Sequence, residues 1–187
     1  MKKRGNRREK IISKDKHGQV WVETVVYLLI AFVMMGLVLS FIKPKIEEMR
    51  DKTIIEQTVE VIKEIDSSIV TIGSPGNKRL LEIGVRKGTL NIDAENNAVI
   101  FEMESAYAYS EAGATIQSGN VEVTTQETAR NYNIIIKRDF NQEYDLTYDN
   151  LQLPKALTKS PTAYNIYITN KGEGNPPSKI WIDFSLQ

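Results

Sequence analysis

One segment of the chain, from Thr24 to Ile42, has no charged residue at 19 consecutive positions. As an α-helix this segment would be roughly 28 Å long, about the thickness of the hydrocarbon core of a bilayer. A Lys-Pro-Lys sequence follows it, and we expect Pro44 to bend the helix because proline lacks a backbone N–H donor. The pattern predicts a transmembrane helix over residues 20–42, within a longer helix.

Beyond this segment, apolar residues recur at spacings of three, four or seven, the pattern of an amphipathic helix. They are Ile46, Met49, Ile55, Val59, Ile62, Ile65 and Ile69. Charged residues, Asp51 among them, are expected on the other faces, and a Gly-Ser-Pro-Gly sequence at 73–76 should end the helix. We therefore predict one helix over residues 19–72. Its apolar stripe would pack against the domain that follows, and it could also contribute to the helical core of a filament.

Residues 78–187 show short alternating runs of apolar residues between Gly, Asn, Asp and Ser, a pattern typical of strands. The predicted strands are Leu80–Val85, Thr89–Ile92, Ala98–Met103, Val121–Thr125, Tyr132–Arg138, Tyr144–Tyr148, Tyr164–Thr169 and Ile180–Phe184. A polar turn at 93–97 should join the second and third of them. The fold class is predicted to be α+β, with a long, partly transmembrane N-terminal helix followed by an antiparallel β-sandwich or curved-sheet head domain.

The net charge of zero hides a strong asymmetry along the chain. Residues 1–18 carry eight basic and two acidic groups, so the remainder has a net charge of −6. A basic tract directly before a spanning helix usually stays on the cytoplasmic side of the membrane. We therefore expect a single-pass membrane protein with a cytoplasmic N-terminus and an extracellular C-terminal domain. Nucleic-acid binding by the basic tract is the disfavoured alternative.

The chain has no cysteine, and its single histidine, His17, lies in the basic tract. Disulfides are therefore excluded. The residues after Gly18 also lack the commonest zinc ligands, the usual base at neutral pH, and the Cys–His and Ser–His nucleophile systems. We expect no metal, no cofactor and no enzymatic activity.

Gly18 comes before the apolar segment, so cleavage between Gly18 and Gln19 would remove the basic leader (1–18) and keep the helix. Glu23 lies four residues after Gln19, on the same helix face as the new amino terminus. A carboxylate in the first turn also suits the positive end of the helix dipole. If such helices pack in an axial stagger, Glu23 could meet a neighbour's amine and fix the register of assembly.

The sequence Lys-His-Gly-Gln-Val-Trp-Val-Glu at 16–23, followed by the apolar helix, resembles the archaeal class III signal peptide-containing prepilins of the type IV pilin superfamily. The resemblance covers roughly residues 14–45. It implies that a prepilin peptidase cuts after Gly18, that Gln19 begins the mature chain, and that Glu23 acts in assembly. Trp21 is a departure, because the family often has serine or alanine near this position.

The resemblance implies a structural subunit of an archaeal pilus, an extracellular filament with a role in cell adhesion. The implied partners are the prepilin peptidase, other pilin subunits, an assembly ATPase and a membrane platform protein. Two other interpretations stay open: a minor pilin that primes or tips a filament, and a non-polymerising, membrane-anchored β-domain that acts as a binding module. An ordinary secretory signal peptide cut before Phe41 is disfavoured, because the apolar run is longer than usual for such a peptide.

Overall fold

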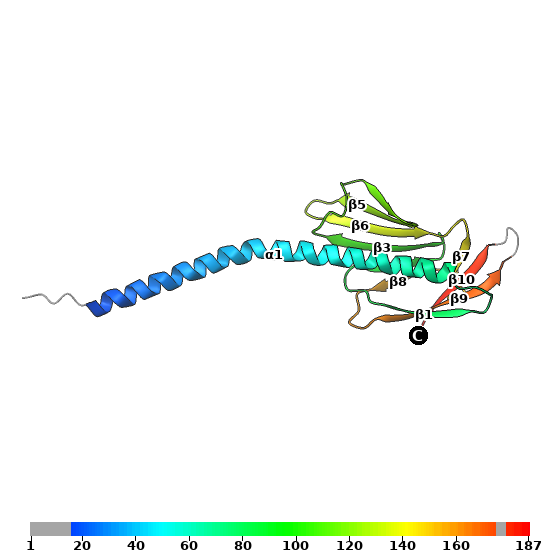
Figure 1. Cartoon of the computed structure of the whole chain (residues 1–187), viewed down its shortest axis with the longest axis horizontal. Coiled ribbons are helices and arrows are strands. Elements are labelled where there is room, and N and C mark those ends of the chain that lie inside the picture. The colour runs from blue at the N-terminus through cyan, green and yellow to red at the C-terminus, as the bar shows by residue number, and fades with distance from the viewer. Residues whose placement is uncertain (1–15, 175–178) are drawn as a thin grey trace, which may run out of the picture. The chain divides into compact units, whose positions relative to one another are not determined.

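The computed structural model describes the backbone of residues 16–174 and 179–187, and the side chains of 20–174 and 179–187. The predicted leader therefore lies outside the described residues, except for its last three backbone positions. The elements are α1 (Lys16–Val70), β1 (Lys78–Ile83), β2 (Thr89–Asp93), β3 (Ala98–Ser105), β4 (Thr115–Ser118), β5 (Val121–Glu127), β6 (Tyr132–Asp139), β7 (Tyr144–Tyr148), β8 (Lys155–Thr158), β9 (Tyr164–Glu173) and β10 (Ile180–Leu186) (Figure 1). The chain divides into two compact units, the first ending at Lys43 and the second running from Pro44 to Gln187.

The predicted long N-terminal helix is confirmed as α1, which contains Pro44. In its first part, the apolar side chains between Val20 and Ile42 are almost all exposed, Phe41 by 77 %. The helix ends at Val70, and its last carbonyls accept hydrogen bonds from the residues that follow: Ser67 from the Thr71 N–H at 3.0 Å and Ile69 from the Ile72 N–H at 3.3 Å. Gly73 then adopts a φ of +75°, and the Asn77 side chain donates a hydrogen bond to the Ile72 carbonyl at 2.8 Å.

The second part of α1 packs on the β-strands of its own unit. Five members of the predicted stripe are at most 3 % exposed, and they share one core with residues of both sheets. They are Ile55, Val59, Ile62, Ile65 and Ile69. The predicted packing is therefore confirmed for these five. It is wrong for Ile46 and Met49, which are 42 % and 65 % exposed because they precede the covered part of the helix.

The strands form two sheets, with the orders β1-β9-β10-β7 and β4-β5-β6-β3-β2-β8. All eight predicted strands are present, and two short ones, β4 and β8, were not predicted. The predicted antiparallel pairing is confirmed for most of the domain, and one pair departs from it, since β7 and β10 run parallel. The connection between them contains β8 and β9, and it is long enough for the crossover that parallel strands require.

Two carboxylates of α1 are bound by the β-domain. Asp51, expected on a polar face, is only 4 % exposed; it accepts hydrogen bonds from Lys87 Nζ at 2.6 Å and from the Ala106 N–H at 2.8 Å. Asp66 accepts from Arg138 Nε at 2.7 Å and from the Asn120 side chain at 3.0 Å. Asp51 thus lies off the apolar stripe, as expected, but it is buried, because the strand connections cover it and supply two donors.

Candidate functional site

The predicted cleavage site lies in the first turn of α1. Gly18 and Gln19 are helical, since α1 begins at Lys16, and their side chains lie outside the described residues. The first four N–H groups of a helix have no partner within the helix. Opening the chain at Gly18 for a peptidase would therefore break few hydrogen bonds.

Glu23 is an exposed carboxylate at the start of the apolar segment. The Tyr27 hydroxyl, one turn later, donates a hydrogen bond to Glu23 Oε1 at 3.2 Å. Among the described side chains, no cation lies within ion-pair distance of Glu23. An ionised carboxylate can accept about four hydrogen bonds, so Glu23 retains capacity for an amine or guanidinium.

The side chains of the apolar segment that follows Glu23 are not buried in the structure. α1 is long and apolar enough to cross a membrane, and none of its most apolar stretch is buried. In lipid, a helix meets its backbone hydrogen-bonding needs internally, and its apolar side chains are well solvated there. Outside lipid, the same surface requires other apolar helices around it. The segment is therefore suited to a membrane and to a helical assembly.

The β-domain also carries polar side chains, and their arrangement bears on metal binding and acid–base chemistry. Within residues 20–174 and 179–187, no three His, Cys, Asp or Glu side chains cluster closely enough to hold a metal ion. One polar cleft is lined by Glu122, Arg138, Asp139 and Glu143 among others. Burial acts to raise the pKa of Asp139, but hydrogen bonds from the Asn141 N–H and the Lys137 ammonium outweigh it and lower that pKa. A carboxyl that is ionised even more readily than usual is not suited to act as a general acid.

A groove on the outer side of α1 has no counterpart in the sequence analysis. It is lined by Ile46, Met49, Arg50, Thr53, Ile54 and Arg86. The last of these comes from the connection between β1 and β2, so the sequence pattern of the helix alone could not reveal the groove. The exposure of Ile46 and Met49 is the signal that identifies it.

The fold and these surfaces define a β-domain carried on a helix of membrane-spanning length. Comparisons with protein-family models, with curated proteins and with solved structures each gave no match for this chain. The features that bear on the function of this chain are therefore α1, the Glu23 carboxylate and the β-domain.

Proposed function

We propose that this chain is a type IV pilin-like structural subunit of a surface filament, which its N-terminal helix anchors in the membrane before assembly. One observation carries the proposal: the helix from Val20 to Ile42 is apolar on every face and uncovered, and it begins with a single exposed carboxylate, Glu23. A membrane anchor needs only the apolar surface. The carboxylate near its start is what a simple anchor does not require.

In this proposal, a prepilin peptidase removes residues 1–18, and Gln19 becomes the amino terminus. Helix-to-helix burial of apolar surface then drives assembly, at roughly 25 cal/mol per Å². Glu23 forms an ion pair with the N-terminal amine of Gln19 in a neighbouring subunit. A shifted register would leave the carboxylate and the amine buried without a partner. Apolar contact thus supplies the free energy, and the ion pair selects the register.

In the filament, the β-domain would face solvent around the helical core. Before cleavage, the basic leader would lie on the cytoplasmic side of the membrane. Side chains from both sheets enter one core, which supports a sandwich arrangement of the head domain. The role of the filament in adhesion follows from the family resemblance. The assembly ATPase and platform protein are implied in the same way.

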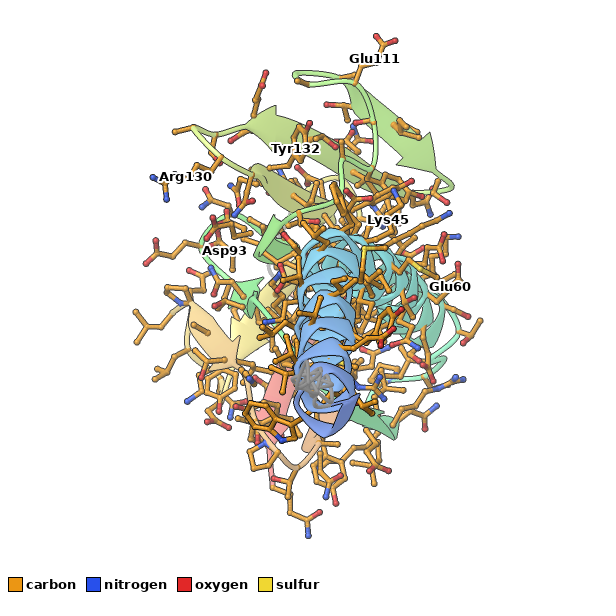
Figure 2. All side chains as sticks on the ribbon, turned by 90° about the vertical axis from the view of Figure 1, so that its left-hand side faces the viewer. Lys45, Glu60, Asp93, Glu111, Arg130 and Tyr132 are labelled. Atoms are coloured by element: carbon orange, nitrogen blue, oxygen red, sulfur yellow. The ribbon has the colours of Figure 1, made fainter. Side chains whose placement is uncertain are left out.

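The test is mass spectrometry of the N-terminus, on protein from membranes and from filaments sheared off cells. We expect Gln19 as the first residue in both fractions. Glu23→Ala should be processed normally but largely lost from the sheared fraction. Glu111→Ala is the control, because that exposed carboxylate lies on the connection between β3 and β4, outside α1 and its grooves (Figure 2). Normal filaments from Glu23→Ala would remove the role given to Glu23.

A second candidate is a membrane-anchored binding module that never polymerises, and the membrane-spanning length of α1 is the observation that favours it. It predicts an intact leader and no protein in the sheared fraction. A minor pilin would instead appear there in small amounts beside a different major subunit. The same two fractions therefore separate all three functions.

A further inference from the structure

The groove on the second part of α1 is an apolar surface with a cationic edge. Its floor is Ile46, Met49 and Ile54, and it joins a second groove that shares Ile54 and Arg86 and reaches Val61. Among the described residues, no carboxylate lies within ion-pair distance of Arg50. Arg86 makes one long hydrogen bond, to Gln57 at 3.5 Å. The groove therefore offers an uncovered apolar surface and a guanidinium without an ion-pair partner.

The same chain carries a segment with the complementary composition. Residues 24–42 are apolar and uncharged, and Glu23 at their start has no cationic partner among the described side chains. The groove, from Ile46 to Val61, extends about 22 Å along the helix, and the apolar segment extends roughly 28 Å. The segment is therefore long enough to cover the whole groove.

The two surfaces also share one spacing. Residues at positions 0, 4, 7 and 11 lie on one face of a helix. On the apolar segment these residues are Glu23, Tyr27, Ile30 and Met34. On the groove they are Arg50, Ile54, Gln57 and Val61. With parallel helices, a shift of 27 residues, or about 40 Å, places each member of the first set beside a member of the second.

We propose that the groove of one copy binds the apolar segment of a second copy, with Glu23 of the second copy paired to Arg50 of the first. This inference rests on the proposed function, and it names the axial stagger of neighbouring subunits. Because a carboxylate accepts several hydrogen bonds, Glu23 of the second copy can accept hydrogen bonds from Arg50 of the first copy and from the Gln19 amine of a third copy, which is shifted by a different distance. Arg86 lies along the same groove and keeps its edge cationic.

Cysteine cross-linking tests the stagger, because the natural chain contains no cysteine. Full-length Ile30→Cys and Gln57→Cys copies, with tags of different size, are produced together and oxidised in sheared filaments. A disulfide needs Cβ atoms within about 4.5 Å, so the stagger predicts a dimer that carries both tags. Lys52→Cys replaces Gln57→Cys in the control, since Lys52 is exposed on a different face of α1. The mixed-tag dimer should be several-fold more abundant with Gln57→Cys than with this control.

A charge exchange tests the ion pair. Glu23→Arg and Arg50→Glu should each reduce the filament yield, and the double variant should recover most of the loss. Filaments that begin at Gln19 but give no mixed-tag dimer above the control would overturn the stagger and leave the proposed function standing. Absence of filaments from the natural chain would instead count against the proposed function.

Discussion

Removing the Asp66 carboxylate should destabilise the β-domain far more than removing an exposed charge on the same helix. Asp66 and Arg138 join α1 to β6, with Nε and Oδ1 2.7 Å apart. Their side chains are only 15 % and 12 % exposed. In Asp66→Ala, Arg138 keeps its charge in a largely desolvated position, and the Asn120 amide loses its acceptor.

The magnitude follows from this burial. Breaking a buried ion pair by removing one partner costs about 3–5 kcal/mol. Because a small part of each side chain still meets water, we expect about 3 kcal/mol for Asp66→Ala, near the lower end. The double variant Asp66→Ala/Arg138→Met removes both charges and should cost only about 1–2 kcal/mol, since Met retains apolar volume beside the Phe140 ring, over which Arg138 lies. Arg138→Met alone leaves the Asp66 carboxylate without its cation and should also cost about 3 kcal/mol, so the expected coupling energy is about 4–5 kcal/mol.

The assay is urea unfolding of the full chain in detergent, followed by the fluorescence of Trp181 in a Trp21→Phe background. Lys63→Ala is the control, because Lys63 pairs with Glu60 on the exposed side of α1, with side chains 37 % and 72 % exposed. That pair should contribute about 0.5 kcal/mol. If the costs of Asp66→Ala and Arg138→Met were additive to within about 0.5 kcal/mol, the two residues would not be coupled and the reasoning would be refuted.

Three further predictions concern the core, one turn and the alkaline limit of stability. Ile62→Ala should lower the free energy of unfolding by about 3 kcal/mol, because Ile62 is fully buried, whereas Ile46→Ala should change it little; urea midpoints compare them. Gly88→Ala should cost about 3 kcal/mol, because the φ is +80° and a Cβ would clash with the Glu102 carbonyl oxygen; Gly84→Ala, with open space, should be tolerated. Burial, and then the charge of Glu143, raise the pKa of Tyr144, so its stabilising effect should be complete below pH 10, the ordinary tyrosine pKa, and lost as the pH rises through the folded pKa. Tyr144→Phe should remove that part of the alkaline loss of stability; an unchanged pH profile would contradict it.

The helix and eight strands could be predicted because each has a periodic pattern of apolar and polar residues in the sequence. The isoleucine stripe repeats at helical spacing, and in strands such as β3 buried and exposed residues alternate. The two strands that were not predicted have too few buried apolar residues to show such a pattern. In β4, three of the four residues are exposed, and in β8 only Leu157 is buried. Both are held by pairing with longer strands, which is a tertiary effect.

The parallel β7–β10 pair and the buried Asp51 could not be predicted for a similar reason. Asp183 on β10 accepts a hydrogen bond from the Thr147 hydroxyl of β7 at 2.8 Å and one from the Asn150 N–H at 2.7 Å. Asp51 is bound by donors 36 and 55 residues away in the chain. A helical pattern places such an aspartate among polar positions, and only the fold supplies its partners.

The two parts of α1 use apolar residues in different ways. Before Pro44 they occupy every face and are exposed, which suits contact with lipid or with other apolar helices. From Ile55 onward they occupy one face, and the chain's own strands cover it. Ile46 and Met49 lie between these two parts: they belong to the predicted stripe of the second part, but they are exposed like the residues of the first part. Folding of the β-domain does not bury these two side chains, whereas the proposed assembly would cover them with a neighbouring helix. Substitutions at Ile46 and Met49 should therefore separate folding from the proposed assembly most clearly.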